Sequence, residues 1–256
     1  MIRLACLSIG YLIGCIQTAY LTGKKKANID IRDFGSGNAG TTNIARQLGF
    51  KTGVFVFVVD VLKAVLAFFL CSYVFAFTGI DPLLLGLYAG AGVILGHNFP
   101  IFFNFRGGKG IACSLGVILC VDWRAALVIY AIGIILVLLM RYISLASIVM
   151  LALFPISTLV LNRSTEIIIL ATLFSALAIF QHRGNIKRLV SGTERKVTLK
   201  LKKKSEKHIE KIEDEKHTEK MDEKLTEKIE DEKLAEKIED EKHTEKMEDE
   251  KHADES

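Results

Sequence analysis

The stretch VFVFVVDVLKAVLAFFLCSYVFAF, residues 54–77, decides the fold class of this chain. It is apolar almost throughout, and a helix needs about 20 such residues to cross the hydrocarbon of a bilayer. Further apolar runs precede and follow it, at Leu4–Thr22, Leu83–Phe103, Ala125–Met140, Ser144–Leu161 and Ile167–Phe180. A soluble domain does not place so many apolar runs nearly end to end. The sequence therefore predicts an all-α polytopic membrane protein.

Charge divides the chain into two parts. Residues 1–204 hold 22 Lys and Arg against 7 Asp and Glu, whereas residues 205–256 hold 11 Lys against 22 acidic residues. We expect an integral membrane domain over 1–204 and an acidic Glu/Lys-rich repeat tail over 205–256. The tail repeats every nine residues, so its apolar positions fall on opposite faces of a helix. A coiled coil is therefore disfavoured, and we interpret the tail as disordered or as a solvated helix.

The short run Ile111–Val121 decides the number of spans. Its 11 residues are too few to cross a bilayer by themselves. A hairpin of two helices over Ile111–Met140 nevertheless places most basic segments on one side, which gives about seven transmembrane helices. Positive charge marks the cytoplasmic side, so we expect the N-terminus outside and the C-terminus in the cytoplasm. Asp60 and Lys63, three residues apart in a span, are expected to form a structural ion pair.

The first polar segment reads GSGNAGTTN over residues 35–43 and is followed by Arg46. Its glycines allow backbone N–H groups to converge on an anion, and a helix starting there adds partial positive charge. A tight, capped turn is the alternative interpretation. The segment also matches the dinucleotide-binding fingerprint, but that fingerprint needs a preceding strand, which this sequence lacks. The candidate ligand groups here are Ser36, Asn38, Thr42, Asn43 and Arg46.

Two later segments carry the same chemistry. Residues 96–110 combine His97 with Arg106 and the run Gly107-Gly108-Lys109-Gly110, and residues 181–189 combine a histidine and an asparagine with several cations. The three segments together predict a phosphate-binding site beside a bilayer. The five cysteines lie in or beside apolar runs with no Cys/His spacing of the kind that binds metals, so we expect no metal and no cofactor.

These segments resemble the bacterial acyl-phosphate–glycerol-3-phosphate acyltransferase family. The matching motifs are GSGNAGTTNIAR (35–46), GHNFP with RGGKG (96–110), SLAS (144–147), HRGNIKRL (182–189) and GTE (192–194), and the resemblance covers essentially all of residues 1–204. It implies a multi-pass protein of the bacterial cytoplasmic (inner) membrane, with its active site facing the cytoplasm. It also implies transfer of a fatty acyl group from acyl-phosphate to the sn-1 hydroxyl of glycerol 3-phosphate, giving lysophosphatidic acid and phosphate.

The resemblance also assigns residues and partners. It implies a functional link to an enzyme that produces acyl-phosphate, and no role for nucleic acid. The expected catalytic residues are Ser36, Arg46, Lys109, His182 and Asn185. The expected substrate-binding residues are Asn38, Thr42, Asn43, His97, Arg106, Gly107, Gly108, Gly110, Ser147 and Arg188. Arg106 stands where the family commonly has lysine, which keeps the charge but presents a planar fork.

Acyl-phosphate is a mixed anhydride with a good leaving group, so we expect direct attack by the acceptor hydroxyl without an acyl-enzyme. Either His182 or the substrate's own phosphate would take the proton. The alternative function is a membrane transporter or channel for a phosphorylated metabolite, since charges within a membrane and glycine-broken helices also suit transport. A membrane scaffold acting through the charged tail is a third interpretation, but it leaves the three polar segments unexplained.

Overall fold

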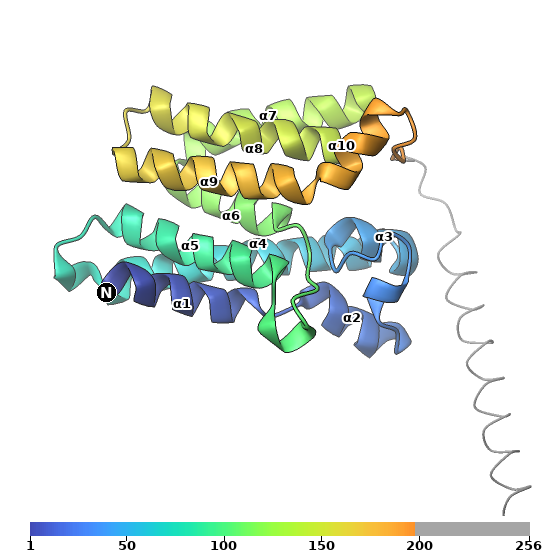
Figure 1. Cartoon of the computed structure of the whole chain (residues 1–256), viewed down its shortest axis with the longest axis horizontal. Coiled ribbons are helices and arrows are strands. Elements are labelled where there is room, and N and C mark those ends of the chain that lie inside the picture. Colours follow the sequence, from blue (N-terminus) through green and yellow to red (C-terminus); the bar gives the residue numbers. More distant parts are fainter. Residues whose placement is uncertain (198–256) are drawn as a thin grey trace, which may run out of the picture. The chain divides into compact units, whose positions relative to one another are not determined.

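The computed structural model describes residues 1–197, and its regular structure is entirely helical. The predicted tail over 205–256 lies outside the described residues. Figure 1 shows long helices running side by side, with shorter ones gathered at one end. In chain order the helices are α1 (Ile2–Gly14), α2 (Thr18–Ala27), η1 (Ile31–Asp33), α3 (Thr41–Leu48), α4 (Phe50–Val74), η2 (Ala76–Thr78), α5 (Pro82–Asn98), η3 (Ile101–Phe103), α6 (Ile111–Val121), α7 (Trp123–Met140), α8 (Ile143–Val160), α9 (Thr165–Gln181) and α10 (Arg183–Val190).

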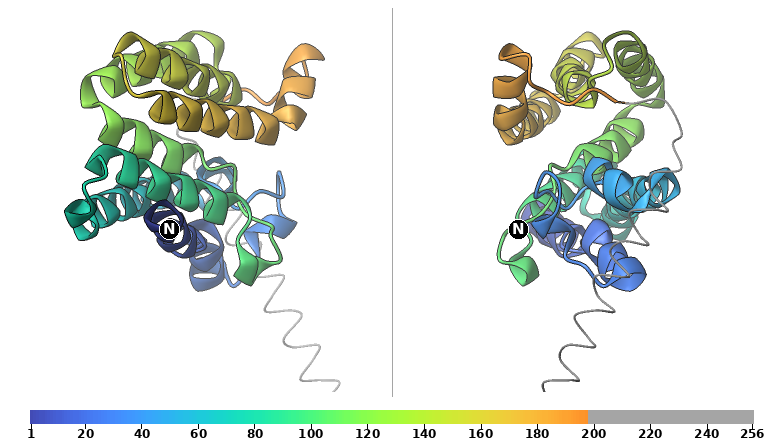
Figure 2. Two further views of the ribbon diagram at one scale, coloured as in Figure 1. Left: turned by 60° about the vertical axis from the view of Figure 1, so that its left-hand side comes forward. Right: turned by 90° about the vertical axis from the view of Figure 1, so that its right-hand side faces the viewer.

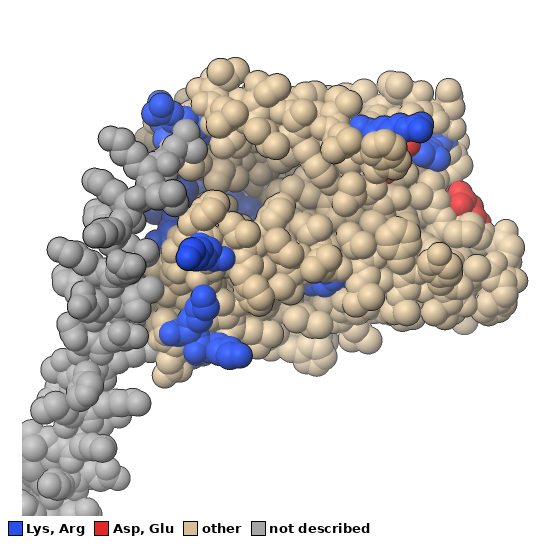
Figure 3. Space-filling view, turned by 180° about the vertical axis from the view of Figure 1, so that it is seen from behind, with Lys and Arg blue, Asp and Glu red and all other residues tan. Residues whose placement is uncertain are grey.

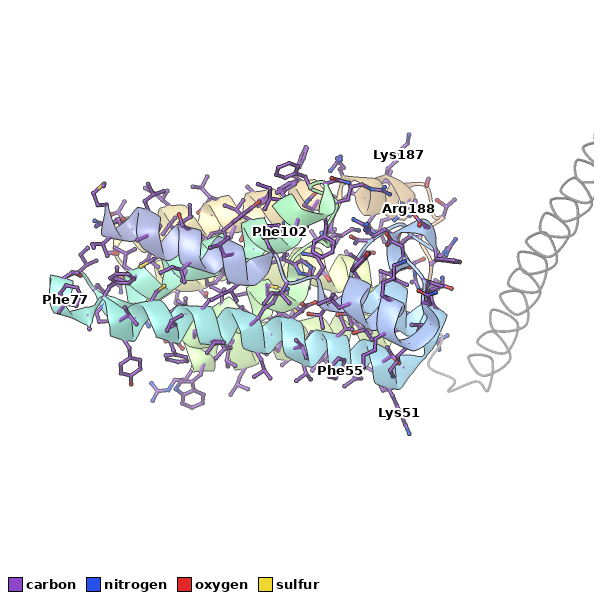
Figure 4. All side chains as sticks on the ribbon, turned by 90° about the horizontal axis from the view of Figure 1, so that it is seen from below. Lys51, Phe55, Phe77, Phe102, Lys187 and Arg188 are labelled. Atoms are coloured by element: carbon purple, nitrogen blue, oxygen red, sulfur yellow. The ribbon has the colours of Figure 1, made fainter. Side chains whose placement is uncertain are left out.

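The predicted class of helical membrane protein is confirmed. Within residues 1–197, five helical segments are long and apolar enough to cross a bilayer, and α9 with α10 makes a sixth if that pair, bent by 59°, is one span. Large apolar side chains such as Phe55 and Phe77 on and beyond α4 point outward, as lipid-facing residues do (Figure 4). Helix α6 is only about 16 Å long at 1.5 Å per residue, so the seventh span and the orientation stay predictions.

The first apolar run, predicted over Leu4–Thr22, forms one candidate span over Ile2–Ala27, and its helix is interrupted within the span. Helix α1 ends at Gly14 and α2 begins at Thr18. The break frees backbone carbonyl groups, and the buried Lys63 ammonium donates to two of them, at 3.5 Å to Gly14 O and 2.8 Å to Ile16 O. The interruption therefore supplies acceptors for a charge that the membrane does not solvate.

Lys63 also completes the ion pair that the sequence predicted. Its Nζ lies 2.8 Å from Asp60 Oδ1, and these side chains are only 6% and 1% exposed. Thr18 Oγ1 donates to the same carboxylate oxygen at 2.8 Å, and His97 Nδ1 lies 3.0 Å from the ammonium. The pair thus has polar partners from α2, from α5 and from the break between α1 and α2, as a charge pair within membrane helices requires.

The predicted hairpin over Ile111–Met140 is confirmed. Asp122 separates α6 from α7 and caps the latter by accepting from the backbone N–H groups of Arg124 and Ala125. The Tyr130 hydroxyl donates to the carbonyl of Leu115, and these residues lie almost equally far from Asp122 along the chain. The two helices therefore fold back on each other rather than continuing as one.

Helices α1 and α5 pack backbone against backbone. A Cβ atom added at Gly10 would lie 2.0 Å from Ala89 O, and one at Gly14 would lie 2.3 Å from Val93 O. The reciprocal glycines of α5, Gly92 and Gly96, are equally close to backbone atoms of α1. Such small-residue contacts are the usual means by which membrane helices approach closely. This contact holds the C-terminal end of α5 beside α1, and the loop of residues 99–110 starts from that end.

The three polar segments predicted to bind phosphate lie at the same end of the bundle. Helices α2, α3 and α10 and the loop after α5 gather there in two different views (Figures 1 and 2). Lys and Arg side chains concentrate toward that end on the face drawn in Figure 3. Segments far apart in the sequence are therefore brought to one place.

The α1–α5 contact predicts the effect of a single methyl group. Gly10→Ala should destabilise the protein by about 1–3 kcal/mol, since the new Cβ meets rigid backbone rather than a movable side chain. This loss is measured by thermal unfolding in detergent, followed by the reaction of a thiol-reactive dye with the cysteines that unfolding exposes. Gly184→Ala in α10 is the control, because its Cβ would meet only the end of Arg188 at 3.6 Å. Equal melting temperatures for the two variants would contradict the backbone contact.

Candidate active site

A cavity of about 1020 Å³ opens at the end where the polar segments gather. It is walled by α3, α6, α8 and α10, the ends of α5 and α9, and the glycine-rich loops. The cavity brings together every site residue predicted from the sequence. These are Ser36, Asn38, Thr42, Asn43, Arg46, His97, Arg106, Gly107, Gly108, Lys109, Gly110, Ser147, His182, Asn185 and Arg188.

The first loop is organised by the side chain of Asn43. Its Nδ2 donates to the carbonyls of Ile31, Phe34 and Asn38 at 2.9 to 3.1 Å, while its Oδ1 accepts from Ser36 N at 3.1 Å. Because both ends of this side-chain amide are hydrogen-bonded to backbone groups, Asn43 stabilises the conformation of the loop. Helix α3 then begins at Thr41, and its first residues Thr41 and Thr42 line the cavity.

The second loop packs on the end of α5 and against the first loop. A Cβ at Gly107 would lie 2.0 Å from His97 O, and one at Gly108 would lie 2.1 Å from His97 Nε2 and 3.0 Å from Ala39 O. The Gly108 N–H donates to His97 O at 3.0 Å. Glycine is therefore required here for close approach, and His97 supports the loop from inside the protein. Helix α6 starts directly after Gly110, at the cavity wall.

A hydrogen-bonded chain joins the second loop to the third segment. Lys109 Nζ donates to Asn185 Oδ1, and Asn185 Nδ2 donates to Glu194 Oε1 at 2.7 Å. Glu194 also accepts from Ser144 Oγ at 2.8 Å and from Arg188 Nε at 2.7 Å. Glu194 thus fixes the position of three cavity side chains. Lys187, by contrast, points away from the bundle (Figure 4).

Glu194, Ser144 and Arg195 line the cavity but were not predicted as site residues. Glu194 belongs to the GTE motif and is an acid within a basic stretch, with Arg188 before it and Arg195 directly after it. An isolated carboxylate among cations is a signal for a buried partner, and it could have identified this residue. Ser144 carried no comparable signal, because a serine at the start of an apolar run is ordinary.

The cavity holds more positive charge than its own carboxylates neutralise. Among the described lining residues the carboxylates are Glu194 and Asp60, and Asp60 is already paired with Lys63. The lining cations are Arg46, Arg106, Lys109, Arg183, Arg188 and Arg195. An anion in this cavity would therefore meet a strongly favourable field.

The cations in the cavity perturb one another. Burial, followed by the nearby Arg188, lowers the pKa of Lys109 to about 8. Burial and the neighbouring Arg195 also lower the pKa of Arg46. Burial alone would raise the pKa of Glu194, but hydrogen bonds from Asn185, Ser144 and Arg188 outweigh it and lower that pKa. The site therefore contains an ionised Glu194, whose hydrogen bonds join its segments. It also contains buried cations that repel one another, and a bound phosphate would neutralise part of that charge.

His182 lies at the bend between α9 and α10 and is 3% exposed. Its Nδ1 lies 2.7 Å from the carbonyl of Ala178, which can only accept a hydrogen bond. The proton of the neutral ring therefore resides on Nδ1, which leaves the Nε2 lone pair free.

Asp60, His97 and Cys113 bring ligand atoms within 4.8 Å of one another, as a metal site would. The Lys63 ammonium lies between two of them, 2.8 Å from Asp60 and 3.0 Å from His97. This cluster already contains its own cation, so these residues do not fit a metal ion.

One wall of the cavity is apolar. Phe57, Leu115, Val137 and Met150 line it from α4, α6, α7 and α8. The cavity therefore joins a cationic, glycine-rich half to a hydrocarbon-lined half. A site of this kind, placed at the end of membrane-spanning helices, defines a membrane protein that handles a phosphate-bearing lipid or lipid precursor.

The chain belongs to the glycerol-3-phosphate acyltransferase family, whose model matches residues 4–192. A glycerol-3-phosphate acyltransferase of Thermoanaerobacter sp. (strain X514) is 47% identical over 189 residues, which cover 74% of this chain and 92% of that protein. One of Clostridioides difficile (strain 630) is 43% identical over 189 residues, with the same coverage.

Two solved structures of a glycerol 3-phosphate acyltransferase are similar to this chain and support the assignment to the family. The crystal structure of PlsY (YgiH), an integral membrane glycerol 3-phosphate acyltransferase, in its glycerol 3-phosphate form has a TM-score of 0.70 and 36% identity, and covers 77% of this chain and 96% of that one. Its lysophosphatidic acid form has a TM-score of 0.68. This chain is therefore a multi-pass membrane acyltransferase that acylates glycerol 3-phosphate in phospholipid synthesis.

The lowered pKa of Lys109 predicts an alkaline limit to activity. The kcat/KM for glycerol 3-phosphate should fall by up to about tenfold per pH unit above pH 8, since the ammonium loses its charge there while the substrate stays a dianion. The free-enzyme pKa governs this profile, so kcat/KM is the quantity to measure. In Lys109→Arg the decline should move well above pH 8. A decline at the same pH in that variant would assign the titration to another group.

Proposed function

We propose that this protein transfers a fatty acyl group from acyl-phosphate to the sn-1 hydroxyl of glycerol 3-phosphate, releasing lysophosphatidic acid and inorganic phosphate. The observation that carries the proposal is the shape of the cavity, in which one cationic half continues into one apolar half. An acyl-phosphate has this same division. The phosphate of the acyl-phosphate donor and the phosphate of the glycerol 3-phosphate acceptor are both anions, and the cationic half of the cavity attracts anions.

The cationic half has enough donors for two phosphates. Arg46 and the N-terminus of α3 form one group, and Lys109 with the N-terminus of α6 forms another. Helix N-termini and arginine forks both suit phosphate oxygens. We assign the neutral donors Ser36, Asn38, Thr42 and Ser147 to the orientation of the substrates.

The reaction needs little activation from the protein. The acceptor hydroxyl oxygen attacks the acyl carbonyl carbon, the new ester bond forms, and the bond from that carbon to the phosphate oxygen breaks. Phosphate leaves with the electron pair of that bond. Lys109 and Arg46 stabilise the charge that develops on the carbonyl and on the leaving phosphate. Asn185, held by Glu194, keeps Lys109 in position.

The proton of the acceptor hydroxyl goes to a phosphate oxygen in this proposal. His182 has a free Nε2, but it is 3% exposed and lies among cations, so the positive charge that protonation would give it is disfavoured. The phosphate oxygens carry negative charge and lie beside the reacting hydroxyl. His182 then acts as a hydrogen-bonding group that positions the substrates.

We also propose that the cavity opens to the cytoplasm. The concentration of Lys and Arg at that end of the bundle supports this orientation, because basic residues remain on the cytoplasmic side. Glycerol 3-phosphate, a charged metabolite, would then enter from water, and the acyl chain would enter from the inner leaflet. The supply of acyl-phosphate requires a separate enzyme that converts another activated acyl group into this anhydride.

Phosphate release from synthetic palmitoyl phosphate tests the function. The full chain in detergent should release phosphate only when glycerol 3-phosphate is present, and palmitoyl coenzyme A should give no product. An acceptor analogue without the sn-1 hydroxyl should also be inert. Inside-out membrane vesicles should be active and right-side-out vesicles inactive. Turnover from the thioester, or release that does not need the acceptor, would contradict the proposed donor and mechanism, whereas activity in right-side-out vesicles would contradict only the orientation.

Two variants of His182 test the fate of the proton. His182→Gln keeps a hydrogen-bonding side chain, so kcat should stay within about tenfold of the wild type, whereas removal of an obligatory base costs about 100-fold or more. His182→Ala should mainly raise the KM for glycerol 3-phosphate. Steady-state kinetics at several pH values separate the two parameters. A loss of kcat in His182→Gln as large as that of a missing base would make His182 the proton acceptor.

A further inference from the structure

The face of α8 that lines the cavity changes from polar to apolar along its length. The lining residues are spaced as one face of a helix, and they are Ile143, Ser144, Ala146, Ser147 and Met150. Ser144 hydrogen-bonds to Glu194 at the cationic end, whereas Met150 is the last of the series. Met150 therefore lies at the far end of the apolar half.

Met150 lies directly against a glycine of the neighbouring helix. Gly133 is buried on α7, one turn before the cavity residue Val137 and on the same helix face. A Cβ added at Gly133 would lie 2.3 Å from Met150 Sδ and 2.7 Å from its Cγ. The absence of a side chain at position 133 thus makes the room in which the thioether of Met150 rests.

The atoms that such a Cβ would meet belong to a flexible side chain. Methionine has three rotatable bonds and adapts to irregular space, so Met150 can move without a change in the backbone. Because a side chain at position 133 would occupy the space on the α7 side, the cavity that Met150 already lines is the space into which its side chain can turn. A residue larger than glycine at position 133 would therefore push Met150 into the apolar half.

We propose that Met150, accommodated by Gly133, determines the length of acyl chain that the cavity accepts. This inference rests on the proposed function. With the phosphate of the donor held near Lys109, the chain extends along α6 and α8, past Leu115 and Ala146, toward Met150. The position of one methionine side chain then sets how much of the chain fits.

Donors of different lengths test this inference. For decanoyl, myristoyl, palmitoyl and stearoyl phosphate, kcat/KM is measured with the full chain in detergent. In Gly133→Ala the ratio of stearoyl to decanoyl phosphate should fall by about tenfold, as expected for a few methylene groups that no longer fit. In Met150→Ala the ratio should rise. The double variant should recover a ratio near or above that of the wild type.

Ile134→Ala is the matched control, because Ile134 follows Gly133 on α7 but its side chain is 60% exposed, away from the contact with Met150. Its chain-length ratio should equal that of the wild type. An unchanged ratio in Gly133→Ala and Met150→Ala would overturn the inference while the proposed function stands. A uniform loss with all donors in Gly133→Ala, not recovered by Met150→Ala, would also overturn it. If wild-type protein accepts no acyl-phosphate of any length, the proposed function itself fails.

Discussion

The close contact between α1 and α5 is the constraint on which the site depends. Gly10 and Gly14 let α1 approach the backbone of α5 to a distance that no larger residue permits. This fixes the end of α5, and with it His97, whose carbonyl and ring form the support for Gly107 and Gly108. A glycine-rich loop has little structure of its own. Its conformation comes from the rigid helix pair beneath it.

Charge balance follows from the same arrangement. The break between α1 and α2 exposes carbonyl groups to Lys63, and Lys63 neutralises the Asp60 carboxylate, which is 1% exposed. The buried charges of the bundle are thus satisfied internally. The cations of the cavity are not, since they have Glu194 as their carboxylate partner and repel one another. The cavity thus holds an excess of positive charge that an anionic substrate would balance, whereas Asp60 and Lys63 balance each other within the bundle.

The sequence was sufficient to predict many of the residues that line the cavity, because they are polar in a chain that is otherwise apolar. Loop glycines, Arg46, Lys109 and His182 stand out against hydrocarbon, and each lines the cavity. What could not be predicted depends on side-chain geometry. The break after Gly14 is invisible in an apolar run, because it exists to serve a lysine some 49 positions later in the chain. Asn43 has a side chain of the kind that binds phosphate oxygens, yet its amide nitrogen donates to backbone carbonyls of its own loop.

The residues of the apolar half of the cavity could not be predicted from the sequence, for a different reason. In a soluble protein an apolar pocket is conspicuous, whereas here Leu115, Val137 and Met150 are chemically the same as the lipid-facing residues beside them. Their role follows only from which side of the helix they occupy, and α7 has almost no amphipathic character by which to tell the sides apart. Gly133 provides the discriminating information, since a glycine buried in an apolar helix has a packing reason, and in this chain that reason is Met150. In this chain the small residue therefore marks the shape of the apolar half of the cavity more clearly than its large neighbours do.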